Sequence, residues 1–206
     1  MPAVIPVQLA VEDALSEAVL RAILKQSGRP FAVGVCYQRG GYGYLKKTIA
    51  GFNQAARGTP FVVLADLDQQ YLCPPALIAD WLRVPKHPNL LFRIAVREIE
   101  SWVLADREAI SSFLGVRQDV IPRNTDQLPD AKRSLMDVVR KSRKREFRSA
   151  ILPSPGSTAK QGPDYNGPLV KFVESRWKVR RAARNSPSLK RAIDAVRSFT
   201  INLDHR

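Results

Sequence analysis

The chain has 206 residues, of which 45% are hydrophobic and 25% are charged, a composition typical of a globular protein with a well-packed core. No apolar run reaches about 18 residues, so we expect no membrane span. The N-terminus lacks the basic-then-apolar layout of a signal peptide. Cys36 and Cys73 are far from any metal-ligand spacing, which favours a reducing cytoplasm and two buried, unreactive thiols.

The net charge of +14 is distributed unevenly. Residues 1–130 contain 14 Lys and Arg against 13 Asp and Glu, whereas residues 131–206 contain 19 against 6. This asymmetry favours a polyanionic partner, first of all nucleic acid; the alternatives are a solvated helix face or the rim of a protein interface. The candidate nucleic-acid contacts are Lys141, Arg143, Lys144, Arg145, Lys160, Arg180 and Arg181.

The first half of the chain alternates apolar runs with segments of helical periodicity. The runs predict strands at Val4–Leu9, Phe31–Tyr37, Phe61–Ala65 and Leu90–Val96. Helices are predicted over Asp13–Lys25, Leu45–Ala56, Pro74–Leu82 and Glu98–Leu104, followed by a short helix that Asp106 caps and that reaches Leu114. Gly40–Gly43 is interpreted as a flexible loop. This β-α alternation predicts an α/β fold with a parallel sheet flanked by helices on both faces.

The regular spacing of hydrophobic residues becomes weaker after residue 115, where the chain becomes basic. The expected elements are a connector over Gln118–Pro129, a helix over Ala131–Phe147, a loop over Leu152–Pro168, a helix from Pro168 to Trp177 and a last helix that begins at Ser186-Pro187. We therefore predict a domain over residues 1–115 and a basic, mainly helical extension over residues 116–206 that packs on it.

Carboxylates follow three of the predicted strands. Glu12 follows the first, Asp66 and Asp68 the third, and Glu98 and Glu100 the fourth. Because the carboxyl ends of parallel strands share one edge of a sheet, these side chains can meet there. Clustered carboxylates need a neutralising cation, and Mg²⁺ is the first candidate because it takes oxygen ligands and commonly sits beside phosphates.

Each carboxylate also has a structural interpretation. Asp66 and Asp68 project to one side of an extended segment, but Asp is equally common in turns and helix caps. Glu12 stands before a helix, where the helix dipole favours a negative charge whatever its function. Glu98 is the next residue in the alternating series of core-facing positions of the fourth strand, yet it also fits a first helical turn. Arg97 is positioned to pair with Glu98 or Glu100.

Other chemistries have little support in the sequence. His87 and His205 are the only histidines. The sequence therefore gives little support to a Ser-His-Asp or Cys-His catalytic arrangement or to a His-rich zinc site. The Gly40–Gly43 segment matches neither a P-loop nor a dinucleotide-binding motif. Trp81, Trp102 and Trp177 stand at helical spacing among aliphatic residues, which predicts core packing. Lys160 and Tyr165 lie in a Gly- and Pro-rich segment that could approach a phosphate or serve as a plain surface linker.

Glu12 after the first strand and Asp66-x-Asp68 after a later one resemble the layout of a Toprim domain, which occurs in topoisomerases, primases and OLD (overcoming lysogenization defect) nucleases. The E-x-E-x-W-x-x-A-D stretch from Glu98 to Asp106, together with the Ser186-Pro187-Ser188-Leu189 segment, looks like a family of small, largely uncharacterised bacterial Toprim-like proteins. The chain departs from the Toprim pattern at Asp13, where a Gly commonly follows the first Glu.

The resemblance implies phosphoryl transfer that depends on Mg²⁺ or Mn²⁺. Glu12 would be a general acid/base or a metal ligand, Asp66 and Asp68 would hold metal, and Glu98 or Glu100 would complete a second metal position. It also implies an ATPase partner in phage defence. We therefore expect a nuclease acting on DNA or RNA, and a toxin acting on RNA or tRNA is a less favoured variant. The alternative is a non-catalytic subunit that binds nucleic acid or regulates a partner ATPase.

Overall fold

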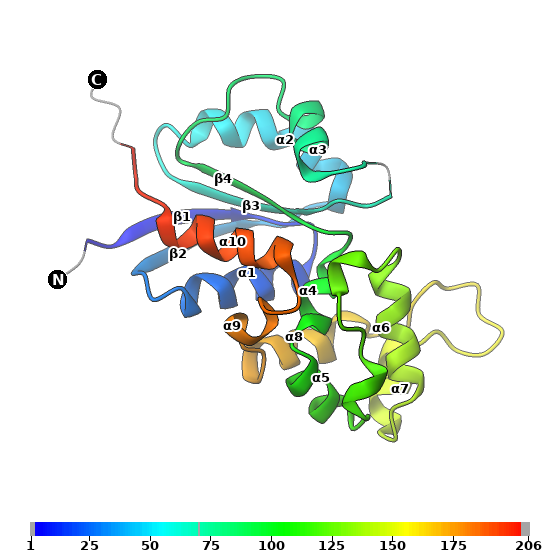
Figure 1. Ribbon diagram of the computed structural model, residues 1–206. Helices are drawn as coiled ribbons and strands as arrows, with labels where there is room; N and C mark the ends of the chain where they lie inside the picture. Colours follow the sequence, from blue (N-terminus) through cyan, green and yellow to red (C-terminus); the bar gives the residue numbers. More distant parts are fainter. Residues whose placement is uncertain (1–2, 70, 203–206) are drawn as a thin grey trace.

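The computed structural model describes residues 3–69 and 71–202, and within them four parallel strands form one sheet (Figure 1). The strands are β1 (Ile5–Ala10), β2 (Phe31–Tyr37), β3 (Phe61–Asp66) and β4 (Leu90–Ala95), in the order β2-β1-β3-β4. The apolar runs of the sequence therefore mark the strands to within a residue or two. The predicted α/β class, with a parallel sheet flanked by helices, is confirmed.

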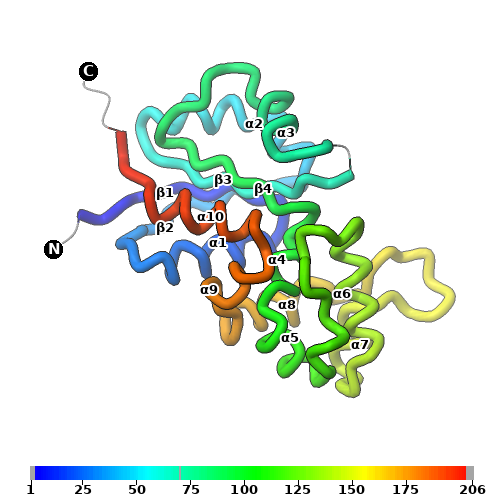
Figure 2. The backbone as a smooth tube through the Cα atoms, in the orientation of Figure 1, coloured from blue at the N-terminus to red at the C-terminus, as the bar shows by residue number. Residues whose placement is uncertain are grey.

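Helices cover both faces of the sheet (Figures 1 and 2). On one face, α2 (Gly41–Ala55) and α3 (Pro74–Trp81) pack over β3 and β4 around Phe61, Val63 and Phe92. On the other face lie α1 (Ala14–Gln26), α4 (Ile99–Ala105) and α10 (Pro187–Ser198). β1, β3 and β4 thus alternate their side chains between two separate apolar clusters, whereas the edge strand β2 has no fully buried residue.

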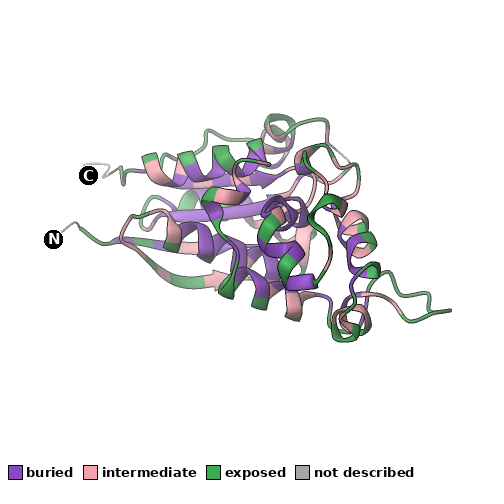
Figure 3. Ribbon diagram, turned by 60° about the horizontal axis from the view of Figure 1, so that its bottom comes forward, coloured by how far each residue is buried: buried purple, intermediate pink, exposed green. Residues whose placement is uncertain are grey.

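Further helices extend the α1 side of the sheet. They are α5 (Arg107–Leu114), the short 3₁₀ turns η1 (Gln118–Val120) and η2 (Thr125–Gln127), α6 (Ala131–Arg140), α7 (Arg145–Ile151), α8 (Asn166–Ser175) and α9 (Val179–Ala182). Their apolar side chains join those of β1 and α1 in one continuous core. Figure 3 colours all buried residues purple, and they run through these helices as well as the sheet. Trp102 and Trp177 lie fully inside this core, and Trp81 is buried in the cluster on the other face, so the core role predicted for all three tryptophans is confirmed.

The predicted helix over Ala131–Phe147 is wrong, because the chain breaks between α6 and α7. Ser142 is buried in the break, and its hydroxyl donates to the Leu114 carbonyl at 2.5 Å while accepting from the Lys144 N–H at 3.1 Å. Serine hydroxyls that bond to backbone groups in this way compete with continued helix.

The predicted loop over Gly40–Gly43 is also wrong, since α2 begins at Gly41. Gly40 has a φ of 78°, a left-handed conformation that glycine adopts without strain, and this turn starts the helix four residues earlier than apolar spacing indicates. The helix predicted from Pro168 likewise begins earlier, at Asn166. Pro168 then falls within the first turn, where its missing N–H costs no intrahelical hydrogen bond.

Both ends of the described chain lie at the amino-terminal side of the sheet (Figure 1). Asn202 is tied there by two bonds to Asn89, which precedes β4: its N–H donates to Asn89 Oδ1 at 2.7 Å, and its carbonyl accepts from Asn89 Nδ2 at 2.9 Å. The opposite, carboxyl-terminal edge of the strands is therefore left to the loops that carry the acidic residues. No helix in these ranges combines the length and hydropathy that a bilayer crossing requires.

The prediction that both cysteines are buried is wrong. Cys36 is half-buried on β2, and burial raises the pKa of its thiol to about 12. Cys73 is exposed at the start of α3. Both are free thiols.

Candidate active site

The candidate site lies where the order of the sheet changes direction. The chain moves from β1 to β2 on one side and then returns to place β3 on the other side of β1. In open α/β sheets, the carboxyl ends of strands at such a switch point leave a crevice where ligands bind. Glu12 follows β1 and Asp66 ends β3 at this point, and Glu12 Oε1 accepts a hydrogen bond from the Asp66 N–H at 2.9 Å.

Asp68 follows β3 in a left-handed conformation, with a φ of 53°. Aspartate tolerates this region better than most residues, and such conformations gather at functional sites. The backbone is fixed from both sides, because the Asp68 N–H donates to the Arg97 carbonyl at 3.0 Å and the Asp68 carbonyl accepts from Arg97 Nη1 at 3.2 Å. Arg97 therefore holds the Asp68 backbone, and the structure gives it no ion pair with Glu98 or Glu100.

Glu98 and Glu100 occupy the start of α4. Glu98 is the N-cap residue, and its Oε2 accepts from the Lys132 N–H at 2.8 Å. Glu100 is only 2% exposed, which is rare for a carboxylate. Its Oε1 accepts from the Tyr165 hydroxyl at 2.8 Å, whereas its Oε2 has no hydrogen-bond partner among the described residues. A buried oxygen without a partner is costly, so this atom is available to a ligand.

Burial and mutual repulsion make these carboxylates reluctant to ionise. Burial, together with the nearby Asp68 and Asp13 carboxylates, raises the pKa of Glu12 to about 7 against the opposing effects of the Asp66 N–H and Lys132. Burial likewise raises the pKa of Glu100 to about 7 and that of Asp68 above its usual range. The pKa of Asp66 lies well above its ordinary value because of burial, then Glu12 and Glu100.

Lys132, at the start of α6, supplies positive charge inside this cluster. Its Nζ lies 3.7 Å from Glu100 Oε1 and 5.4 Å from the centre of the Tyr165 ring. Burial lowers the pKa of Lys132, but Glu100, Glu98 and other carboxylates outweigh that effect and the net shift is upward. The ammonium is therefore held in its charged form as an internal counter-ion for the carboxylates.

The site includes residues that sequence reasoning missed or misread. Lys132 drew no attention among the many basic residues of its segment. Tyr165, for which the sequence left open an approach to a phosphate or a plain surface linker, is buried against Glu100, so the linker interpretation is wrong for this residue. Asn166 donates from Nδ2 to Asp13 Oδ2 at 3.4 Å, while its own buried Oδ1 has no partner within the described part of the chain. The only signal for these contacts was the polar cluster from Lys160 to Asn166.

The remaining residues of the E-x-E-x-W-x-x-A-D stretch are structural. Trp102 donates from its indole to Ser188 Oγ at 2.7 Å, which joins this stretch to the Ser186-Pro187-Ser188-Leu189 segment. Asp106 caps α5 and is fully buried, with Arg181 donating to both of its carboxylate oxygens at 2.5 and 3.0 Å. The two motifs therefore lie in contact and hold α4 against α10.

A cavity of about 260 Å³ opens beside the carboxylates, lined by Asp68, Gln69, Arg97, Glu98, Pro129 and Asp130. It gives solvent and ligands access to the acidic edge of the sheet from the side of Asp68 and Glu98.

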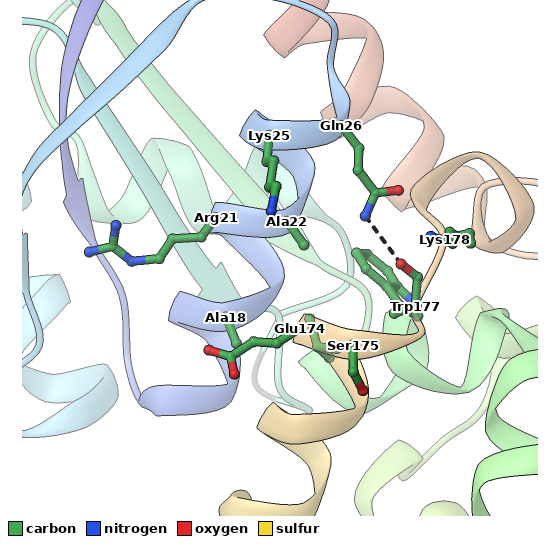
Figure 4. A pocket seen from close by; sticks show the side chains of 10 residues that line it. Ala18, Arg21, Ala22, Lys25, Gln26, Glu174, Ser175, Trp177 and Lys178 are labelled. Carbon is green, nitrogen blue, oxygen red and sulfur yellow. Dashed lines mark hydrogen bonds between the residues drawn. The ribbon is translucent and has the colours of Figure 1, made fainter.

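A larger cavity of about 420 Å³ lies elsewhere, between α1 and α8 (Figure 4). It contains Arg21, Lys25 and Glu174 above an apolar floor, and Gln26 closes it by donating to the Trp177 carbonyl at 3.1 Å. We place the site at the smaller cavity because it is lined by Asp68, whose pKa burial raises, and by Glu98, both at the acidic edge of the sheet.

The donor set suits Mg²⁺ or Mn²⁺ in chemistry, since it consists of carboxylate oxygens that include the unpartnered Glu100 Oε2. Across residues 3–69 and 71–202, however, no three His, Cys, Asp or Glu side chains are arranged as a ready metal site. Glu12 Oε1 is engaged by the Asp66 N–H, and Lys132 already neutralises part of the charge. Metal binding would therefore require these side chains to deprotonate and reorient.

The predicted nucleic-acid contacts divide into exposed and internally bonded residues. Lys144 donates from Nζ to the Phe113 carbonyl at 2.7 Å, and Arg181 is tied to Asp106 and Glu108, so both stabilise the fold. The exposed ones are Lys141, Arg143, Arg145, Lys160 and Arg180. Lys141 and Arg143 line a hollow of about 380 Å³ with Arg117. Arg180 lines another, of about 360 Å³, on α9 and α10.

Comparison with known proteins adds no relative. No family model matches the chain, and neither the curated proteins nor the solved structures include a significant match. The functional argument therefore rests on the residues and the geometry of the site.

Proposed function

We propose that this protein is a metal-dependent nuclease of the Toprim type that hydrolyses phosphodiesters of DNA or RNA. The observation that carries the proposal is the meeting of Glu12 and Asp66 across the switch point of the sheet, with Asp68 and the buried Glu100 close enough to raise their pKa values. Buried carboxylates from separate strands that repel one another favour a bound cation, because the cation offsets their charge, and such clusters are typical of phosphoryl-transfer sites.

Glu12, Asp66, Asp68 and Glu98 are the residues that would hold Mg²⁺ or Mn²⁺, with Glu100 as a further oxygen donor. The ion would supply charge stabilisation for the phosphate and lower the pKa of water. Glu12, with a pKa of about 7, can accept or return a proton near neutral pH. Lys132 holds a positive charge beside Glu100, where it offsets the negative charge of a bound phosphate.

The exposed cations would hold the nucleic-acid backbone. Lys141, Arg143 and Arg145 follow α6, whose first turn carries Lys132 at the site. A strand seated at the carboxylates can therefore continue along this helix toward the basic α6–α7 turn. Because such contacts act through phosphate charge, we expect affinity to fall steeply with salt and to depend little on sequence. The family resemblance adds an ATPase partner and a role in phage defence to this proposal.

The decisive experiment compares the wild-type protein with Asp66→Asn and with Asp119→Asn, a matched control at an exposed ion pair with Arg117. Single-stranded DNA, duplex DNA and RNA are incubated with Mg²⁺, Mn²⁺ or EDTA. Cleavage that needs metal, disappears in Asp66→Asn and persists in Asp119→Asn supports the nuclease. Equal loss of folding and of nucleic-acid binding in Asp66→Asn would instead assign Asp66 a structural role.

One observation favours a second function. Lys132 already provides a cation within the cluster, and the described residues contain no ready metal group. A degenerate site of this kind suits a non-catalytic subunit that binds nucleic acid or regulates an ATPase. The two functions differ in their response to metal, because a ligand that binds only the folded protein raises its melting temperature. A nuclease should be stabilised by Mg²⁺ or Mn²⁺ through its carboxylates, and a binding subunit should be indifferent.

A further inference from the structure

Leu72 is 94% exposed, the highest value among the large hydrophobic side chains that stand out of the described surface. The other three, Val4, Val35 and Val84, lie between 52% and 62%. Single exposed apolar residues are common on proteins and need no special cause. Leu72 differs from the other three in two ways. It follows Asp68 of the candidate site by only four residues, and the backbone on both sides of it is held in place.

The chain length from Asp68 to Leu72 keeps their Cα atoms within about 14 Å. Stacked bases rise by about 3.4 Å per step, so Leu72 lies within about four steps of a phosphate bound at Asp68. A duplex seated at the carboxylates and running toward α3 would therefore pass close to this side chain.

The backbone beside Leu72 is held rigidly to the site. Arg97 Nη1, which donates to the Asp68 carbonyl, also donates to the Tyr71 carbonyl at 3.1 Å. The Tyr71 hydroxyl donates to Asp80 Oδ2 at 2.6 Å and accepts from Lys46 Nζ at 3.2 Å. One guanidinium thus ties Leu72's neighbour to the residue that would bind metal.

The other side of Leu72 is fixed as well. Cys73 is the N-cap of α3, and Pro74 and Pro75 open the helix with restricted φ angles. Leu72 is therefore an apolar side chain held out into solvent between two anchored neighbours. Rigid presentation of this kind lowers the entropy lost when a side chain inserts into a partner.

We propose that Leu72 is a wedge that enters the base stack of double-stranded nucleic acid and opens it beside the phosphate to be cleaved. This inference rests on the proposed nuclease function and names its substrate as a duplex. Proteins that kink duplexes insert apolar side chains such as leucine between base steps, and the burial of the side chain offsets part of the cost of unstacking.

The test uses Asp66→Asn protein, which should bind without cutting, and a duplex with 2-aminopurine near its centre. Binding should increase the fluorescence of the probe, and adding Leu72→Ser should abolish that increase while Leu72→Phe retains it. In otherwise wild-type protein, Leu72→Ser should lower the cleavage rate of a paired duplex about tenfold, since about 1.4 kcal/mol of lost insertion energy corresponds to that factor. Cleavage of the same sequence with a three-base mismatch bubble should stay within about twofold, because the bubble is already unstacked.

Val84→Ser is the matched control, as it removes an exposed apolar residue away from the site. Equal fluorescence and equal cleavage of both substrates by wild type and Leu72→Ser would overturn the wedge while leaving the nuclease intact. A change in sedimentation coefficient on Leu72→Ser, with nucleic-acid behaviour unaltered, would also overturn it and assign Leu72 to a protein contact. If the wild-type protein neither binds nor cuts any nucleic acid, the proposed function itself fails, a result distinct from the other two.

Discussion

Glu12 and Asp66 stand 54 residues apart in the chain, yet the Glu12 carboxylate accepts a hydrogen bond from the Asp66 backbone N–H at 2.9 Å. The contact spans the point where the sheet order reverses, so it exists only because β3 lies beside β1. It places an acidic side chain at the carboxyl end of the adjacent strand. The backbone donor favours the ionised form of Glu12, while burial and the neighbouring carboxylates oppose it.

The pKa of about 7 for Glu12 predicts a stability that falls as pH rises. A carboxyl whose pKa is higher in the folded than in the unfolded protein binds protons more tightly when folded, so its contribution is complete below pH 4.5 and lost by about pH 7. The shift corresponds to a contribution on the order of 3 kcal/mol. We expect a lower melting temperature at pH 8 than at pH 5.5, and Mg²⁺ should restore more stability at pH 8.

Glu12→Gln is the variant that checks this dependence, because its amide cannot ionise. Thermal unfolding of the variant should change less between pH 5.5 and pH 8 than that of the wild type, and Mg²⁺ should stabilise it less. Asp194→Asn, at an exposed ion pair with Lys190, should behave as the wild type does. A wild-type melting temperature that rises from pH 5.5 to pH 8 would contradict the burial of these acids in their protonated form.

Tyr165→Phe tests the hydrogen bond to the buried Glu100. Without the hydroxyl, both oxygens of Glu100 lack a hydrogen-bond donor, and the expected cost is about 1–3 kcal/mol of unfolding free energy. Because that bond also lowers the pKa of Glu100, its loss should shift the rising limb of the cleavage rate to higher pH. Chemical denaturation and a pH–rate profile measure the two effects. Tyr44→Phe, on α2 against Phe52, is the control and should leave the profile unchanged.

The sheet and its acidic edge could be predicted because both depend on local pattern. Continuous apolar runs such as Phe61–Ala65 identify buried parallel strands, and parallel connection brings every strand's carboxyl end to one edge. The positions of Glu12, Asp66 and Glu98 therefore follow from strand assignment alone. The contact between Glu12 and the Asp66 N–H agrees with the expectation that these strand ends share one edge.

The contacts of Lys132 and Tyr165 with Glu100 could not be predicted, because they depend on how the basic segment folds back on α4. Glu100 and Tyr165 are 65 residues apart, and no periodicity within residues 116–165 indicates which side chains turn inward. The break between α6 and α7 depends likewise on the buried bond between Ser142 and the Leu114 carbonyl. Ser142 also accepts from the Lys144 N–H, but the long-range bond to Leu114 is not indicated by any local pattern.

Lys132→Met removes the internal counter-ion of the carboxylates. Because Lys132 lowers the pKa values of Glu12, Asp68 and Glu100, the methionine variant should ionise these groups at higher pH. Its cleavage rate at pH 7 should fall, and Mg²⁺ should bind more tightly once the carboxylates are ionised, since the competing ammonium is gone. Calorimetric titration of Mg²⁺ at pH 8.5 measures the second effect. Lys190→Met, on the exposed face of α10, is the control, and an unchanged Mg²⁺ affinity in Lys132→Met would contradict the counter-ion role.

Arg180 and Arg181 are neighbours on α9 with opposite expected roles. Arg181 donates to both oxygens of the fully buried Asp106, and Arg181→Gln would leave that carboxylate without its charged partner. We expect a loss of about 2–3 kcal/mol of unfolding free energy, because the Lys178 and Ala109 N–H groups still donate to Asp106. Arg180 is exposed, so Arg180→Gln should leave stability within about 0.5 kcal/mol of the wild type.

The same two variants should have the opposite order of effect on nucleic-acid binding: Arg180→Gln should weaken it, and Arg181→Gln should not. Arg180→Gln should weaken binding across sequences and reduce the slope of log affinity against log salt by about 1, as loss of one phosphate contact does. Arg181→Gln, measured at a temperature where it remains folded, should retain the wild-type slope because its guanidinium faces Asp106. Fluorescence anisotropy at several salt concentrations provides the slopes. A wild-type slope in Arg180→Gln would remove α9 from the binding surface and leave the α6–α7 turn and Lys160 as the remaining candidates.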